Sequence, residues 1–151
     1  MSGYVLVLSG PNLSSLARRD PALYGTETLD ELVARTARAA ARHELGVRHV
    51  QSNHEGELID ALEALEPGCV GVLANLGALT HTSVALHDAL ELLTCPVVEV
   101  HLSNPASREP FRHTSLIAPV VAGSIAGFGP MSYELAVAAL VAIGTGSGEL
   151  P

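Results

Sequence analysis

The chain has 151 residues, the size of one domain with a substantial core, and its hydrophobic content of 48% excludes a disordered protein. Its net charge of −8 argues against nucleic acid as a partner, because phosphates require a basic surface. No apolar run approaches the roughly 20 residues of a membrane span, and the amino terminus lacks the pattern of an export signal, so we expect a cytoplasmic protein. The apolar content is high for a small monomer, which favours a homo-oligomer with surface buried between subunits.

Apolar runs alternate with helical patterns along the chain. Residues 4–8 form a continuous apolar run, as buried parallel strands do. Thr28 and Glu31 have the spacing of a capping box, which predicts a helix from Leu29 to about Glu44 that Gly46 ends. The later predicted elements are a strand over 47–52, a helix along the apolar stripe 58–65 that Pro67 closes, a strand over 70–74, a helix capped by Thr82 or Ser83 that runs to Leu93, a strand over 97–102, a strand within 117–125 and a helix from Ser132 to about Ile143.

Strands that alternate with helices at this spacing predict an α/β fold with a parallel sheet. Five strands in a three-layer sandwich point to the flavodoxin-like arrangement, with strand order 2-1-3-4-5. We expect a single catalytic α/β domain over residues 1–143 and a flexible carboxyl-terminal tail over residues 144–151.

Polar residues gather where the predicted strands end, which is where ligand sites lie in open α/β sheets. The first four strands lead to Asn12, to Asn53, to Asn75, and to Glu99 with His101. Asn12 and Asn53, like Asn104 after the fourth strand, each also fit a structural turn when taken alone. Glu99 and His101 share one face of a strand, so they form either a structural pair or a general acid with its orienting carboxylate. Because the pair lies at the carboxyl end of a predicted parallel strand, we favour the general acid with its orienting carboxylate.

The segment 9–25, which reads SGPNLSSLARRDPALYG, contains more than a turn requires. Turns use its Gly, Pro, Ser and Asn residues, but they do not need the guanidinium groups of Arg18 and Arg19 or the phenol of Tyr24. Because loops on a rigid scaffold commonly carry chemistry, this loop is the first candidate for catalytic residues.

The absence of lysine from the sequence excludes several chemistries. All eight basic residues are arginine, so the chain cannot form a lysine Schiff base, anchor pyridoxal phosphate or build a P-loop. A zinc site is disfavoured, because His54 and Glu55 do not begin an H-E-x-x-H motif and His81 and His87 do not share a helix face. Residues 123–129 lack the glycine order of a dinucleotide-binding loop.

Several segments together resemble the type II 3-dehydroquinate dehydratases, also called type II dehydroquinases. The match runs from about Tyr4 to Leu140 without a large gap, and its motifs are GPNL (10–13), RRDPALYG (18–25), QSNHEGELID (51–60), THTSVAL (80–86), PVVEVHLSN (96–104) and REPFRHTS (108–115). The resemblance implies a flavodoxin-like subunit in a homododecamer built as a tetramer of trimers. It also implies a lyase that converts 3-dehydroquinate to 3-dehydroshikimate without a metal or an organic cofactor, in the shikimate pathway or in quinate breakdown.

The resemblance implies a role for each matching residue. Tyr24 would be the general base and His101 the general acid, while Arg19 would stabilise the transition state. Asn12 would hold a water molecule against the enolate oxygen, and Glu99 would support His101. Substrate would be bound by the side chains of Asn75, His81 and Arg112, by the backbone amides of Leu102 and Ser103, and by Asp88 from a neighbouring subunit.

The implied reaction explains why arginine and tyrosine occur together in the loop. A free tyrosine titrates near pH 10, and a cation within about 4–6 Å lowers such a pKa by roughly 1–3 units. We therefore expect Arg19 to make Tyr24 a usable base, under a loop that closes over the substrate. Two other hypotheses stay open: an inactive binding module of the same fold, and a cofactor-free lyase for a related hydroxy-keto acid.

Overall fold

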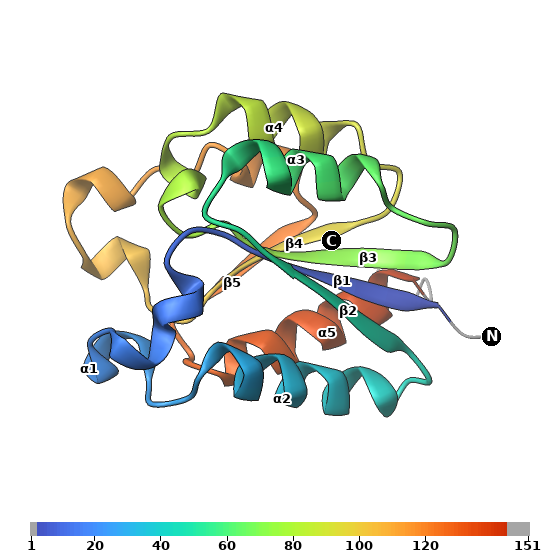
Figure 1. Cartoon of the computed structure of the whole chain (residues 1–151), viewed down its shortest axis with the longest axis horizontal. Coiled ribbons are helices and arrows are strands. Elements are labelled where there is room, and N and C mark those ends of the chain that lie inside the picture. Colours follow the sequence, from blue (N-terminus) through green and yellow to red (C-terminus); the bar gives the residue numbers. More distant parts are fainter. Residues whose placement is uncertain (1–2, 145–151) are drawn as a thin grey trace.

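A five-stranded parallel sheet forms the middle layer of this computed structural model, which describes residues 3–144 (Figure 1). The strand order is β2-β1-β3-β4-β5, so the predicted flavodoxin-like topology is confirmed. The strands are β1 (Tyr4–Ser9), β2 (Gly46–Gln51), β3 (Cys69–Asn75), β4 (Val97–His101) and β5 (Gly123–Ala126).

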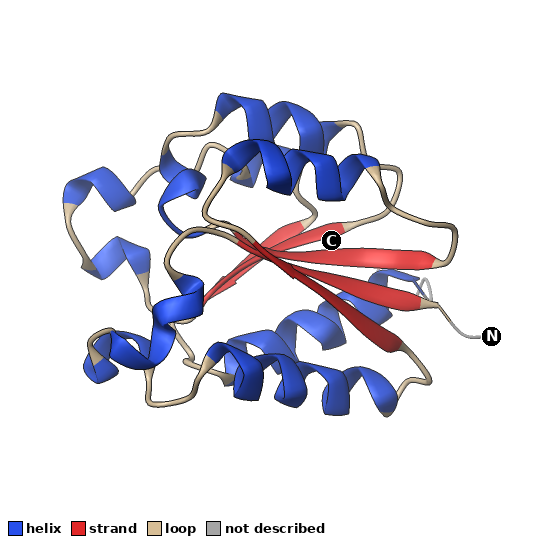
Figure 2. Cartoon of the chain, in the orientation of Figure 1, coloured by secondary structure: helices blue, strands red, loops and turns tan. Residues whose placement is uncertain are grey.

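Helices cover both faces of the sheet, which gives three layers (Figure 2). The α-helices are α1 (Pro21–Tyr24), α2 (Leu29–Ala41), α3 (Glu55–Glu63), α4 (Val84–Glu91) and α5 (Met131–Gly144). Helices α2 and α5 pack on one face, and α3 and α4 pack on the other (Figure 1). The short α1 lies with the loops at the carboxyl ends of the strands, away from the amino terminus.

The alternation of side chains along β1 explains the two helical layers. Val5 and Val7 belong to the core under α2 and α5, whereas Leu6 and Leu8 belong to the core under α3 and α4. A strand sends successive side chains to opposite faces, so a continuous apolar run is buried from both sides. Because the helices cover the two faces of the sheet, the carboxyl ends of the strands stay open for a site.

The end of α2 differs from the prediction. The helix ends at Ala41 rather than near Glu44, and Gly46 is the first residue of β2. Glu44 has a φ of 58°, so it occupies the left-handed position that glycine commonly fills at a helix end. The N–H groups of Leu45 and Glu44 bond to the carbonyls of Ala40 and Ala41 and close the helix. The predicted end of the helix was wrong because Glu44, and not a glycine, occupies this left-handed position.

Two later boundaries also shift. Helix α4 is capped by Ser83, as one of the two predictions had it, but it ends at Glu91 rather than Leu93. Strand β5 begins only at Gly123 and ends at Ala126, one residue beyond the predicted range 117–125, because residues 118–120 form a 3-10 turn. Pro119 within that turn has no N–H to donate to a neighbouring strand.

The carboxyl-terminal boundary can be followed as far as Gly144, which ends α5. The tail predicted over 144–151 otherwise lies outside the described residues, so the division into a domain and a tail stays a prediction. Within residues 3–144, no helix has both the length and the apolar character needed to cross a bilayer.

Candidate active site

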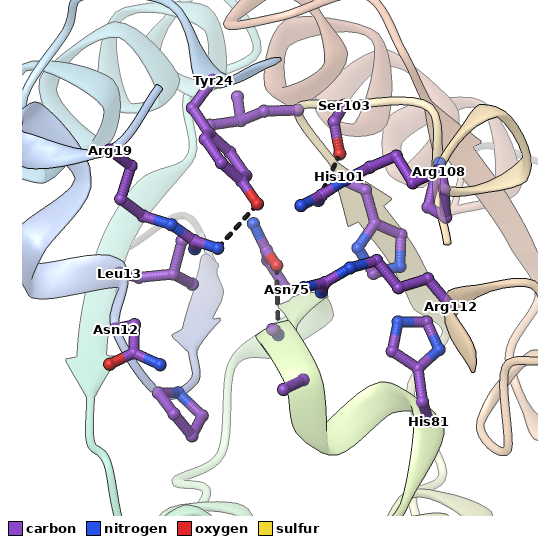
Figure 3. Close-up of a pocket in the computed structure, with 15 residues that line it drawn as sticks. Asn12, Leu13, Arg19, Tyr24, Asn75, His81, His101, Ser103, Arg108 and Arg112 are labelled. Atoms are coloured by element: carbon purple, nitrogen blue, oxygen red, sulfur yellow. Dashed lines mark hydrogen bonds between the residues drawn. The ribbon is translucent and has the colours of Figure 1, made fainter. Parts of the chain in front are cut away.

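A pocket opens at the carboxyl ends of the strands and collects most of the predicted site residues (Figure 3). All of them except Glu99 and Asp88 line it: Asn12, Arg19, Tyr24, Asn75, His81, His101, Leu102, Ser103 and Arg112. They come from the carboxyl ends of β3 and β4 and from the loops after β1, β3 and β4, three strands that are adjacent in the sheet. The prediction that strand ends build the site is therefore supported by their positions.

The loop after β1 places Tyr24 against Arg19. A guanidinium nitrogen of Arg19 donates a hydrogen bond to the Tyr24 hydroxyl oxygen at 2.6 Å (Figure 3), and its Cζ lies 3.9 Å from the centre of the Tyr24 ring. Asp20 caps the short α1 by accepting from the N–H of Ala22 at 2.9 Å, and Gly25 ends it with a φ of 78°. The guanidinium and the phenol oxygen are thus held together at the pocket.

Arg18, the neighbouring arginine, has a different environment. Its side chain is exposed and donates to the hydroxyl of Ser15 at 3.1 Å. Arg19 therefore contacts the phenol, and Arg18 offers a matched control on the same loop.

Side chains at and just beyond the end of β2 hold the turn that carries Asn12. Asn12 has a left-handed φ of 67°, which asparagine tolerates better than most residues. Its N–H donates to the side-chain oxygen of Asn53 at 3.0 Å, and the Gln51 amide donates to the carbonyl of Gly10 at 3.2 Å. Asn53, whose role the sequence left open, thus supports the turn at Asn12.

On the other side of the pocket, His101 and Glu99 form a pair on β4. His101 Nε2 lies 2.6 Å from Glu99 Oε2, and the Glu99 side chain is almost completely buried. Burial alone raises the pKa of Glu99, but His101 and the hydroxyls of Ser115 and Ser124 outweigh it and lower that pKa below its usual value. Glu99 is therefore a carboxylate that holds His101 through Nε2, and Nδ1 is the ring nitrogen left for the pocket.

Two further side chains are fixed by groups that the sequence analysis did not identify. Asn75 donates to the hydroxyl of Tyr133 at 2.9 Å, and burial raises the pKa of Tyr133 to about 12, so this phenol stays protonated. His81 Nδ1 lies 2.8 Å from the carbonyl of Thr114. Because a carbonyl only accepts, Nδ1 carries the proton and Nε2 remains for a ligand.

Arg108 also lines the pocket, and the sequence analysis assigned it no role. Its guanidinium donates to the hydroxyl of Ser103 at 3.2 Å, and its Cζ lies 5.1 Å from the centre of the Tyr24 ring. Arg108 is the first residue of the REPFRHTS motif, which also contains Arg112. Its place in that motif was the signal that could have identified it as a site residue. Arg19, Arg108 and Arg112 make the pocket cationic in a chain of net charge −8, which suits an anionic ligand.

Asp88 lies on α4, outside the pocket of its own chain, and pairs with His87 at 3.0 Å. Its predicted contribution to a neighbouring subunit stays a prediction. Asp88, His87 and Glu91 are also the one group within residues 3–144 whose ligand atoms are close enough for a metal ion, and none of the three lines the pocket. The donor sets of the pocket itself are arginines, amides and imidazoles, which suit an anion better than a cation.

The chain is similar to known proteins over almost its whole length. A family model described as dehydroquinase class II matches residues 3–141. A 3-dehydroquinate dehydratase from Azorhizobium caulinodans is 53% identical over 140 residues, which cover 93% of this chain and 95% of the relative.

Solved structures agree with the sequence comparison. A type II dehydroquinase from Butyrivibrio crossotus has a TM-score of 0.88 at 39% identity, covering 93% of this chain and 98% of that one. One from Propionibacterium acnes has a TM-score of 0.86 at 41% identity, covering 96% and 98%. On this evidence, and with the pocket in the place the motifs predict, the chain belongs to the class II dehydroquinase family.

Proposed function

We propose that the chain removes water from 3-dehydroquinate to give 3-dehydroshikimate, with Tyr24 as the general base and His101 as the general acid. The observation that carries this proposal is the pairing of each group with its partner at the same pocket. Arg19 donates to the Tyr24 oxygen at 2.6 Å, and Glu99 contacts His101 at 2.6 Å. A base and an acid with separate supporting charges are what an elimination requires.

The elimination proceeds in two steps. The Tyr24 phenolate takes a proton from the carbon next to the ketone, and the electrons of that bond move onto the ketone oxygen to form an enolate. Asn12 and an ordered water molecule donate hydrogen bonds to this oxygen. The enolate then collapses, a carbon–carbon double bond forms, and the hydroxyl on the next carbon leaves as water with a proton from His101.

Substrate is held by its carboxylate and hydroxyl groups. The backbone amides of Leu102 and Ser103 receive the carboxylate, and Asn75, His81 and Arg112 bind the carboxylate and the hydroxyls. Arg108 adds positive charge beside them. A non-catalytic binding module would need the cationic pocket but not the Arg19–Tyr24 pair, so we favour the enzyme over this second hypothesis.

The direct test is an incubation of the purified chain with 3-dehydroquinate. The product is a conjugated enone carboxylate that absorbs in the ultraviolet. The rate at which absorbance increases should therefore be proportional to the amount of protein added. A related hydroxy-keto acid that gives the faster rise would favour the other lyase, and no rise with either would leave the binding module.

We expect activity to survive borohydride in the presence of substrate, because the sequence has no lysine to form an imine. Chelators should also leave the rate unchanged, since the pocket is lined by anion-binding side chains. The readouts are residual activity and the intact mass of the protein. Inactivation with a covalent adduct, or a loss that a divalent ion restores, would contradict the mechanism.

We further propose a cytoplasmic homo-oligomer larger than a dimer, a dodecamer built as a tetramer of trimers, in which Asp88 reaches a neighbouring site. This proposal rests on the exposed position of Asp88 and on apolar side chains exposed in the isolated chain, among them Val84 and Leu92 on or next to α4. The reaction would serve the shikimate pathway and aromatic amino acid biosynthesis, or quinate breakdown.

Mixing inactive subunits tests the shared site. Asp88→Ala and Tyr24→Phe subunits should regain part of the activity in mixed oligomers, because some sites then combine an intact Tyr24 with an intact neighbouring Asp88. Arg19→Ala mixed with Tyr24→Phe is the matched control, and it should show no rescue because both residues act within one chain. Light scattering that finds an active monomer, or no rescue by Asp88→Ala in verified mixed oligomers, would overturn the shared site.

A further inference from the structure

The hydroxyl of Ser115 lies behind the His101–Glu99 pair, on the side away from the imidazole. Ser115 Oγ lies 2.9 Å from Glu99 Oε1, while His101 contacts the other carboxylate oxygen, Oε2. Each oxygen of the buried carboxylate therefore has its own donor. Ser115 is half-buried and lies in the loop between Arg112 and β5.

The direction of the Ser115 hydrogen bond follows from its other partner. The N–H of Ala118 donates to Ser115 Oγ at 3.0 Å, so the serine oxygen already accepts one hydrogen bond there. Its own hydrogen is then free to point to Glu99 Oε1. A hydroxyl that donates to a carboxylate stabilises the ionised form, as the lowered pKa of Glu99 reflects.

The backbone on both sides of Ser115 is fixed to the 3-10 helix that carries His81. The carbonyl of Thr114 contacts His81 Nδ1 at 2.8 Å, and the N–H of Leu116 donates to the carbonyl of Thr80 at 2.8 Å. These bonds hold the serine in place before any ligand binds. Ser124 on β5 also donates to Glu99 Oε1, but at 3.3 Å and from an exposed position, so its hydrogen bond is the weaker one.

We propose that Ser115 is a positioning residue for the dehydration, which acts through Glu99 to keep the proton of the pair on His101 and to direct Nδ1 toward the substrate. The proposal rests on the role of His101 as general acid. Without the serine donor, the buried carboxylate is a stronger base and draws the shared proton from His101 Nε2. The imidazole then becomes a weaker acid. Because Glu99 and His101 titrate as a coupled pair, the pair loses its last proton only at a higher pH.

The other charged and titratable groups near His101 are the same in the wild type and in a Ser115 variant. Arg19 and Tyr24 face the pocket from the loop after β1, His81 from the 3-10 helix after β3, and Arg108 and Arg112 from the segment after β4. Tyr133 approaches from α5 through Asn75. A displaced limb of the pH–rate profile in a Ser115 variant therefore reports the Glu99–His101 pair.

The experiment compares pH–rate profiles of the wild type, Ser115→Ala, Ser115→Thr and Ser107→Ala. We expect Ser115→Ala to lower kcat about tenfold with little change in KM, and to move the basic limb upward by roughly half to one pH unit. Ser115→Thr keeps a hydroxyl and should restore the position of the limb. Ser107 is exposed and bonds only to the carbonyl of Asn104, so Ser107→Ala should match the wild type.

Each outcome decides the proposal. A Ser115→Ala enzyme with lower kcat but an unmoved limb would give Ser115 a merely structural role, and a wild-type profile would give it none. If Ser115→Ala fails to fold, Ser115→Thr and Ser124→Ala still test the argument, since Thr should keep the limb and Ser124→Ala should move it by a smaller amount in the same direction. A wild type without dehydratase activity would instead contradict the proposed function.

Discussion

Replacing Tyr24 with phenylalanine is expected to lower turnover by at least about a hundredfold, the low end for the loss of a general base. The substitution removes only the phenolic oxygen that Arg19 contacts at 2.6 Å, and it leaves the buried ring in the core. The fold and substrate binding should therefore persist. Ultraviolet assays of turnover, together with substrate titration by calorimetry, measure both effects.

Tyr4 provides the matched control for this prediction. Its hydroxyl contacts the backbone of Glu66 at the amino-terminal end of β1, whereas the pocket lies at the carboxyl ends of the strands. Tyr4→Phe should lower the melting temperature without lowering turnover. Near-normal turnover in Tyr24→Phe would remove the general base from the mechanism, whatever the control shows.

Replacing His101 with asparagine should lower turnover by about a hundredfold or more, since the leaving hydroxyl then has no proton donor. The two variants should differ in deuterium oxide. His101→Asn keeps the base, so the proton next to the ketone should still exchange with solvent, whereas Tyr24→Phe should lose this exchange as well. Nuclear magnetic resonance of 3-dehydroquinate follows the exchange directly.

His43→Asn is the control for the acid, because His43 is exposed in the turn after α2, away from the pocket. It should leave both turnover and exchange at the wild-type level. If His101→Asn lost exchange to the same extent as Tyr24→Phe, His101 would take part in forming the enolate rather than in expelling the hydroxyl.

The local sequence pattern was sufficient to predict the sheet and the residues at the carboxyl ends of its strands. The buried run 4–8 and the alternation of strands and helices predicted the layers, and the strand ends predicted Asn75 and His101 in one pocket. The end of α2 was mispredicted, because the left-handed turn there is made by Glu44 and not by glycine. Glycine most often fills this position, so the pattern pointed to Gly46.

The supporting residues of the site were harder to predict, because each acts through a contact that is distant in sequence. Tyr133 reaches Asn75 from a helix 58 residues further along the chain, and Ser115 reaches Glu99 from a loop 16 residues away. A serine or a buried tyrosine carries no local sign of such a role. Asp88 differs again, since its proposed partner lies in another subunit and no single chain can place it.

The most direct test of the account is the pH–rate profile of Arg19→Ala, because the central claim is that Arg19 makes Tyr24 a base. The variant keeps the phenol but loses the cation 3.9 Å from its ring, so it should be slow at pH 7 and recover partly as the pH rises. Its acidic limb should move upward, while Arg18→Ala should leave the limb in place. An unmoved limb in Arg19→Ala, or a limb that follows Arg18, would contradict the claim.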